Sequence, residues 1–337
     1  MTHSNNFDFL RFLFSFLVVI GHTIILSEQP EFQNSFFAAM PNYSVLGFFI
    51  ISGFLIYSSY ERSKNLKKYF FNRAKRILPA YFFVVLFFAF FLFLFSAVTF
   101  KEYFSFSWLK HVGVNLIFLN FIQPCIDFVF TNNMTCAVNG SLWTIKVEVM
   151  FYLFIPILFY FIRKLNTTKK NVAIIGLYVF SMVYFSVLTS VNQGLLAKQL
   201  PGFLNYFATG MLLYVNKEFF SKYIYYLLPA AVVVLILEKA VILQSIFTPL
   251  AIGIIIFWFA FSKIPLKNFG KYGDFSYGMY LVHFPIIQIF TQEGIYEKYS
   301  YLGFALSTAV VFIFSVIIWN VIEKNALKRR FNQKSAV

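Results

Sequence analysis

The sequence predicts an all-α membrane protein: a polytopic helix bundle of about ten transmembrane helices with both termini in the cytoplasm. Of its 337 residues, 60% are hydrophobic and only 12% are charged, whereas soluble domains are usually about 25% charged. The apolar residues form runs long enough for spanning helices, unlike the short alternating segments of a membrane barrel. We therefore expect a single transmembrane domain over residues 1–337, surrounded by a lipid bilayer.

Ten apolar segments are expected to cross the membrane, with boundaries good to a few residues. They cover residues 7–27, 43–60, 77–98, 146–163, 171–190, 202–216, 223–238, 244–262, 276–292 and 301–322. The first segment lacks the basic region and small-residue cleavage site of a signal peptide, so we interpret it as a span. The run 112–122 is short and flanked by asparagines, which favours an interfacial or re-entrant helix.

The distribution of basic residues predicts the orientation. With the N-terminus in the cytoplasm, 21 of the 28 Lys and Arg residues fall in cytoplasmic segments and six in outer segments. Lys and Arg gather on the cytoplasmic side of membrane proteins. The net charge of +15 is therefore a consequence of topology, and we expect no nucleic-acid partner.

The longest outer segment, about 99–145, contains five asparagines and both cysteines, Cys125 and Cys136. Cysteines pair in an oxidising compartment, so the sequence leaves open whether these two form a disulfide. This segment is the natural place for an acceptor substrate on the outer side of the membrane to bind.

An arginine and a histidine, Arg11 and His22, lie inside the first span. A helix turns ~100° and rises ~1.5 Å per residue, so their spacing places them within about 20° on one face and about 16 Å apart. The predicted topology puts Arg11 near the cytoplasmic surface and His22 near the outer one. Glu148, at the outer start of the fourth span, reaches the depth of His22, and Tyr152 follows one turn later. Because a carboxylate fixes the tautomer of an imidazole and raises its basicity, His22 and Glu148 are the candidate catalytic pair.

These residues also have structural interpretations. His22 could be a helix–helix hydrogen-bond partner, and Arg11 could snorkel to the interface. Glu148 could be half of an ion pair, with Lys146, Arg11 or Arg76 as its partner. Ionisable residues inside membranes are functional by default but not always catalytic.

Two further motifs each have a functional and a structural interpretation. Arg73 and Arg76 lie at the cytoplasmic entry of the third span, where they are either topology charges or a phosphate clamp. Ser52, in the Ser52-Gly53-Phe54 interruption of the second span, marks either close helix packing or a narrow passage for a thin chain.

A polar stripe follows in the ninth span. Ser276, Tyr280 and His283 recur at i, i+4 and i+7, which places them on one helix face. From these residues alone, packing is favoured over catalysis for His283. The sequence contains no glycine-rich nucleotide loop, no metal-spaced Cys/His cluster and no Gly-x-Ser-x-Gly elbow, so we expect no bound metal and no permanently bound cofactor.

Taken in order, these segments resemble the acyltransferase-3 family of membrane O-acyltransferases. The resemblance is carried by Asp8-Phe9-Leu10-Arg11 with Gly21-His22; Gly47-Phe48-Phe49 with Ser52-Gly53-Phe54; Arg73, Arg76, Pro79 and Tyr81; Ser141-Leu142-Trp143 with Glu148 and Phe151-Tyr152; and Ser276-Tyr277-Gly278 with Tyr280-Leu281 and His283. Lys146 and Val147 depart from the family's pattern, which leaves substrate details open. We expect no esterase-like domain of the kind that some members carry.

The resemblance implies transfer of an acyl group from cytoplasmic acyl-CoA, usually acetyl-CoA, to a hydroxyl of a carbohydrate or lipid-linked glycan. The acceptor would lie on the extracytoplasmic side of a bacterial inner (cytoplasmic) membrane. We expect the donor at Arg11, Arg73, Arg76 and Ser52, and the acceptor at Trp143, Tyr152, Tyr280 and His283. His22, oriented by Glu148, would take the proton of the sugar hydroxyl, with or without a transient acyl-histidine.

Two other functions remain open from the sequence. A transporter or flippase for a lipid-linked sugar would use the same buried polar groups, although its expected internal repeat is not visible. A structural subunit of a polysaccharide complex would have no activity alone. The acceptor sugar, its hydroxyl and the size of the acyl group are also left open.

Overall fold

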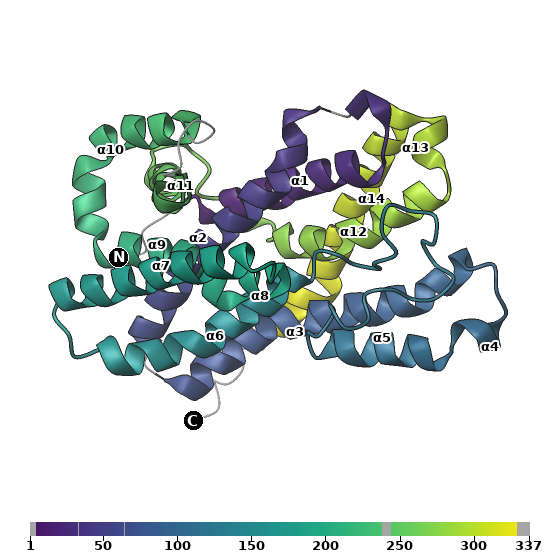
Figure 1. Ribbon diagram of the computed structural model, residues 1–337, viewed down its shortest axis with the longest axis horizontal. Coiled ribbons are helices and arrows are strands. Elements are labelled where there is room, and N and C mark those ends of the chain that lie inside the picture. The colour runs from purple at the N-terminus through teal and green to yellow at the C-terminus, as the bar shows by residue number, and fades with distance from the viewer. Residues whose placement is uncertain (1–4, 33, 64, 238–243, 329–337) are drawn as a thin grey trace. The chain divides into compact units, whose positions relative to one another are not determined.

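The computed structural model describes residues 5–32, 34–63, 65–237 and 244–328, and within these ranges it contains helices and no strand (Figure 1). All ten predicted segments are helical. They correspond to α1 (Phe7–Leu26), α2 (Met40–Ser63), α3 (Leu66–Phe91), α6 (Trp143–Ile162), α7 (Thr167–Ser190), α9 (Leu200–Val215), α10 (Lys217–Leu237), α11 (Gln244–Phe261), α12 (Ser276–Gln292) and α14 (Ser300–Ile318). Five further α-helices are shorter: α4 (Phe100–Tyr103), α5 (Phe106–Leu116), α8 (Gly194–Ala197), α13 (Ile295–Lys298) and α15 (Lys324–Lys328). The described part also contains short 3-10 helices at Pro30–Phe32, Phe36–Ala39, Leu92–Phe95 and Phe269–Lys271, and a π-helical turn at Trp319–Glu323.

The apolar helices make this an integral membrane protein. Among the described residues, seven helical stretches are long and apolar enough to cross a bilayer. They are Phe7–Leu26, Phe36–Ser63, Leu66–Phe95, Trp143–Ile162, Thr167–Ser190, Lys217–Leu237 and Ser300–Leu327. The helices α9 and α12 are apolar but shorter, with 16 and 17 residues. The count of ten spans and the side of the termini stay predictions; Lys64, Lys239, Arg329, Arg330 and Lys334, which entered the charge count, lie outside the described residues.

The chain forms two compact units. The first comprises Met1–Arg11, Val45–Phe70 and Val147–Lys271, and the second comprises Phe12–Ser44, Phe71–Lys146 and Tyr272–Val337. The helices α1, α2, α3 and α6 each contribute residues to both units. The prediction of a single domain stays a prediction.

In the second unit, α1 and α12 run side by side in the same direction. The Ser15 hydroxyl donates to the carbonyl of Ser276 at 2.8 Å near one end. At the other end, the Thr291 hydroxyl donates to the carbonyl of Leu26 at 3.1 Å. The predicted topology has both spans running outward, and this parallel arrangement agrees with it.

The helix α3 runs in the same direction as α12. Arg76, in its first half, pairs with Asp274 just before α12. Past its end, the carbonyl of Phe95 accepts from Gln292 Nε2 at 2.8 Å. The third and ninth predicted spans are both outward, so this relation also agrees with the predicted alternation.

Glycine allows close helix packing in the first unit. A Cβ atom added at Gly53 in α2 would lie 2.9 Å and 3.0 Å from main-chain atoms of Phe207 in α9. The packing interpretation of this glycine is therefore confirmed. Asn171 in α7 and Asn216, directly after α9, exchange amide hydrogen bonds of 2.8 and 2.9 Å, which tie these adjacent helices together.

The outer segment differs from the prediction in one element. The helix expected over 112–122 is α5, which begins earlier because the Ser105 side chain accepts from the Trp108 amide, and ends at Leu116. Phe118, just beyond, has a left-handed backbone (φ 65°) that cannot continue a helix. Downstream, Cys125 and Cys136 form a disulfide, which answers the question left open by the sequence.

Candidate active site

His22 and His283 form a hydrogen-bonded pair in the second unit. Nδ1 of His22 lies 2.8 Å from Nε2 of His283, and the two rings are nearly coplanar, 4° apart in orientation. Each histidine comes from one of the parallel helices α1 and α12. His283 is fully buried, whereas His22 is partly exposed. His22 is therefore the member of the pair that a substrate can reach.

The hydrogen bonds determine where the protons lie. Nδ1 of His283 is 2.8 Å from the carbonyl oxygen of Tyr280, which can only accept, so this nitrogen carries the proton. In the neutral ring Nε2 of His283 is then an acceptor, and Nδ1 of His22 must donate to it. This leaves the lone pair on Nε2 of His22. The pair thus holds His22 in the tautomer that a general base requires.

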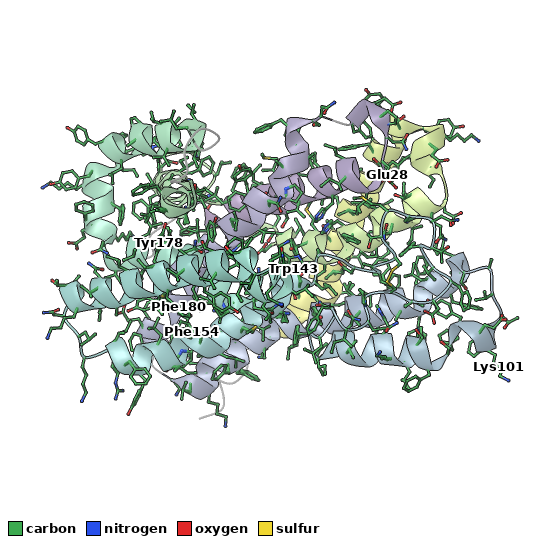
Figure 2. All side chains as sticks on the ribbon, in the orientation of Figure 1. Glu28, Lys101, Trp143, Phe154, Tyr178 and Phe180 are labelled. Carbon is green, nitrogen blue, oxygen red and sulfur yellow. A yellow bond between two sulfur atoms is a disulfide. The ribbon has the colours of Figure 1, made fainter. Side chains whose placement is uncertain are left out.

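Tyr280 and the start of α6 lie beside the histidine pair. The Tyr280 hydroxyl is 2.6 Å from the Thr144 hydroxyl and 3.3 Å from the carbonyl of Ser141. Asn139 donates to the carbonyl of Leu281 at 2.7 Å. These contacts attach the segment before α6 to the helix of His283. Trp143, labelled in Figure 2, is the first residue of α6 and is partly exposed.

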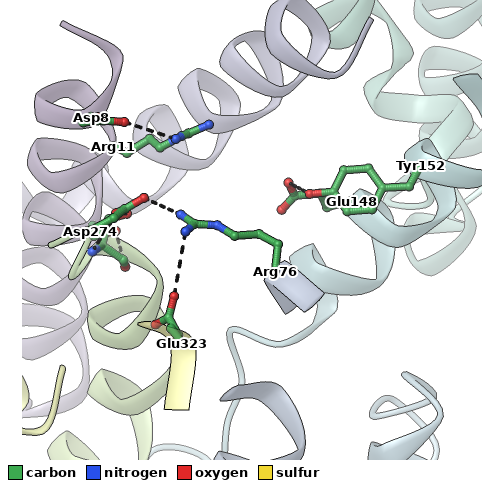
Figure 3. Close-up of polar contacts among 9 residues, drawn as sticks. Asp8, Arg11, Arg76, Glu148, Tyr152, Asp274 and Glu323 are labelled. Carbon is green, nitrogen blue, oxygen red and sulfur yellow. Dashed lines mark hydrogen bonds and ion pairs between the residues drawn. The ribbon is translucent and has the colours of Figure 1, made fainter. Parts of the chain in front are cut away.

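Arg76 has acidic partners in the second unit. Its guanidinium pairs with Asp274, and a second nitrogen lies 3.9 Å from Glu323, as the dashed lines of Figure 3 show. Glu323 is only 2% exposed. Asp274 also accepts from the Ser276 hydroxyl at the start of α12. Arg76 therefore ties α3 to both ends of the α12–α14 hairpin, and its predicted contact with phosphate stays a prediction.

Glu148 has its contacts within the first unit. One carboxylate oxygen accepts from the Tyr152 hydroxyl at 2.5 Å and from the Ser52 hydroxyl at 3.2 Å; Figure 3 shows the contact with Tyr152. The prediction that Tyr152 lies on the same helix face as Glu148 is confirmed. The predicted pairing of Glu148 with His22 joins residues of different units and stays a prediction.

The remaining predicted donor residues are Arg11 and Arg73. Arg11 makes a 3.5 Å contact with Asp8 one turn earlier (Figure 3), and both arginines are partly exposed. Among the described residues, no cluster of three or more His, Cys, Asp or Glu side chains has the arrangement of a metal site.

Comparison with known proteins decides the family. A sequence model whose description is an acyltransferase domain, that of the acyltransferase-3 family, matches residues 4–322. The chain belongs to the acyltransferase-3 family. The match covers nearly the whole chain, including every motif on which the resemblance was based.

Two relatives that match over nearly their full length, and one that matches over half of the chain, carry related names. An O-acetyl transferase of Shigella phage Sf6 is 28% identical over 98% of this chain and 98% of its own length. Nodulation protein 10 of Rhizobium leguminosarum bv. viciae is 25% identical, covering 97% of this chain and 94% of its own. A putative acetyltransferase ORF330 of Acidianus two-tailed virus is 28% identical over 50% of this chain and 46% of its own. No solved structure matches the chain.

For this acyltransferase-3 member, sequence reasoning did not single out Asp274 and Glu323, the acidic partners of Arg76. An arginine at the start of an apolar span could have suggested acidic partners of this kind. His283 was predicted as a contact of the acceptor substrate, but its hydrogen bond to Nδ1 of His22 was not predicted. Ser15 and Ser276 are 261 residues apart in the sequence, and so are His22 and His283. The separations are equal because α1 and α12 run parallel, and a single sequence does not reveal that these two helices are neighbours.

Proposed function

We propose that the protein is an acyl-CoA-dependent O-acyltransferase. It transfers an acyl group, in the simplest case acetyl, from cytoplasmic acyl-CoA to a hydroxyl of a carbohydrate or lipid-linked glycan on the extracytoplasmic side of a bacterial inner membrane. The family and the O-acetyl transferase relative support acyl transfer to oxygen. The observation that carries the proposal is the His22–His283 hydrogen bond, because it leaves a basic nitrogen on the partly exposed ring.

The chemistry follows from the tautomer. Nε2 of His22 takes the proton from the sugar hydroxyl as the oxygen attacks the thioester carbonyl. The carbon–sulfur bond of the tetrahedral intermediate then breaks, and the CoA thiolate takes the proton from His22. The products are the sugar ester and free CoA. While His22 is charged, its Nδ1–H bond to His283 is charge-assisted and therefore stronger.

The position of the basic residues supports donor binding from the cytoplasmic side. Asp274, the partner of Arg76, lies just before Ser276, where α12 begins. His283 is seven residues into this helix, about 10 Å along its axis at ~1.5 Å per residue. Arg73 and Arg76 would bind the CoA phosphates at one end of this path, and the extended pantetheine arm would present the thioester to His22 at the other.

The test of the base is His22→Ala in proteoliposomes supplied with acetyl-CoA and the glycan fraction of the native cell. We expect acyl transfer to fall by roughly 10²- to 10⁴-fold, measured as free CoA thiol and as about 42 Da added to the glycan by mass spectrometry. His111→Asn, which changes another histidine of the same unit, is the matched control. Unchanged transfer by His22→Ala would refute the role of His22, and a wild-type protein that releases no thiol would support the flippase alternative.

The donor site has its own test. Arg73→Ala should weaken CoA binding roughly tenfold or more, since a hydrogen bond to a charged group contributes about 1.5–3 kcal/mol. Lys75→Ala is the control, because Lys75 is on the same helical turn and lies over the Phe71 ring, 4.2 Å from its centre. A CoA dissociation constant that stays within about twofold (~0.4 kcal/mol) would contradict the phosphate contact.

A further inference from the structure

A polar pocket of about 500 Å³ lies in the second unit, outside the histidine pair. Four segments line it: the turn after α1, the residues after α3, the loop closed by the Cys125–Cys136 disulfide, and the stretch from the end of α12 into α13. Glu28, labelled in Figure 2, follows α1 at this pocket. A volume of this size holds one or a few sugar rings, as it lies within the ~300–1,000 Å³ range of small-molecule sites.

The pocket lies beyond the ends of the two helices that carry the histidines. Ser27 lines it five residues after His22, and Thr291 lines it eight residues after His283. At ~1.5 Å per residue, the pocket begins about 8–12 Å along these helices from the histidine pair. One sugar unit is roughly half as long as this distance between the pocket and the histidine pair. When one unit of a glycan is bound in the pocket, a neighbouring unit of the same glycan can therefore reach His22.

The lining has the chemistry of a saccharide site. Asn132 and Gln29 offer amides, and Glu28 and Glu297 offer carboxylates, which together donate to and accept from sugar hydroxyls. The ring of Phe128 is 51% exposed and presents an aromatic face with partial negative charge to the C–H face of a sugar. No Lys or Arg is among the described residues of the lining, so an anionic sugar would meet two carboxylates and no counter-charge.

The pocket is built on hydrogen bonds that hold its loop against α12. Gln292 accepts from the amide of Phe130 and donates to the carbonyl of Phe95, both at 2.8 Å. Asn133 donates to the side-chain oxygen of Gln288 at 3.0 Å. Phe128 and Phe130 both have left-handed backbones (φ 65° and 58°), which cost free energy for bulky residues. A site ordered before binding loses less entropy when the ligand binds.

We propose that this pocket binds uncharged sugar units of the acceptor glycan and so positions a neighbouring unit's hydroxyl at His22. The inference rests on the proposed function, because it takes the substrate to be a glycan that approaches from the outer side. It adds a binding site separate from the reacting groups and a preference for neutral over acidic sugars. Repulsion by Glu28 and Glu297 provides that preference.

Binding can be measured separately from transfer. The full-length protein in nanodiscs is applied to an array of bacterial surface polysaccharides, some neutral and some rich in uronic acids. We expect the wild-type protein to bind neutral polysaccharides and to discriminate against the acidic ones at low salt. Phe128→Gly, which removes the ring while keeping φ 65° accessible, and Asn132→Ala should each raise the dissociation constant roughly tenfold (about 1.4 kcal/mol).

Controls separate this inference from the proposed function. Met134→Ala changes an exposed side chain of the same loop and should bind like wild type, whereas His22→Ala should bind glycan but transfer no acyl group. Replacement of both Glu28 and Glu297 by Gln should admit uronate-rich polysaccharides. Binding that is unchanged in Phe128→Gly and Asn132→Ala, or a wild-type preference for acidic glycans, would overturn the pocket assignment while leaving acyl transfer intact. A protein that binds through the pocket but transfers nothing would overturn the proposed function instead.

Discussion

Replacing His283 tests whether this histidine orients the base or only packs. It is completely buried, and its Nε2 accepts a hydrogen bond from Nδ1–H of His22, with the two nitrogens 2.8 Å apart. His283→Gln can place an amide oxygen where Nε2 lies and so keep the acceptor. His283→Phe keeps a ring of similar size but has no acceptor. The two variants therefore separate hydrogen bonding from packing.

The size of the effect follows from the charge that His22 acquires. A hydrogen bond to a neutral group contributes about 0.5–1.5 kcal/mol, and one to a charged group about 1.5–3 kcal/mol. The bond to His283 is neutral before proton transfer and charged in the transition state, so its loss raises the barrier by about 1–2 kcal/mol. This difference corresponds to roughly 5- to 30-fold in kcat. In His283→Phe, His22 would also lose the hydrogen bond that fixes its tautomer, which would lower kcat further.

The assay is acyl transfer in proteoliposomes, with KM measured for acetyl-CoA and for the glycan. We expect His283→Phe to lower kcat at least fivefold with KM changed little, because the lost bond strengthens only in the transition state. His283→Gln should recover most of the rate. Thermal unfolding in detergent verifies that both variants are folded. A folded His283→Phe variant with wild-type kcat would refute the orienting role and restore the packing interpretation.

Three further predictions concern stability. Arg76→Gln removes the guanidinium that pairs with Asp274 and lies 3.9 Å from Glu323. The loss should cost about 1.5–3 kcal/mol, the contribution of a hydrogen bond between charged groups, and an unchanged melting temperature would contradict this. Burial lowers the pKa of His111 to about 4, below its value of ~6.5 in the unfolded chain. Between pH 6.5 and 4 this histidine is therefore protonated in the unfolded state but largely neutral in the folded state. The free energy of unfolding should fall by about 3 kcal/mol over this range. Denaturation at pH 7 and pH 4.5 should show a smaller loss in His111→Asn, and equal losses would exclude His111 as the cause. Gly53→Ala should lower the free energy of unfolding by about 1–3 kcal/mol, because the added Cβ would meet the main chain of Phe207. Gly176→Ala is the control and should be neutral or stabilising, since nothing lies within 4 Å of its added Cβ. Similar melting temperatures for the two variants would refute the packing argument.

Much of the helical architecture was predictable because spanning helices follow from local composition. An apolar run in lipid must satisfy its own backbone hydrogen bonds, so it forms a helix whatever its neighbours are. All ten predicted segments are helical for this reason. The error at α5 concerns the boundaries of a short helix, whose start depends on one side chain, Ser105, that caps it.

The candidate site was predictable residue by residue but not in its pairings. Arg11, His22 and His283 stand out because polar groups inside apolar runs are costly, and Arg76 stands out because it lies at the entry of a span. Which of them meet depends on the packing of helices far apart in the chain. A single sequence contains no information on which distant helices are in contact, so the hydrogen bond between His283 and His22 was not predicted.

The sequence by itself determined the membrane class, the helical segments and the family motifs. These follow from local hydrophobicity and from side-chain chemistry, neither of which depends on the fold. The tertiary structure alone decided the partner of His22, the acidic partners of Arg76 and the polar pocket beyond α1 and α12. The histidine pair and the Arg76–Asp274 pair join residues 261 and 198 positions apart, and the pocket combines four segments between residues 27 and 297. Only helix packing brings such distant segments together.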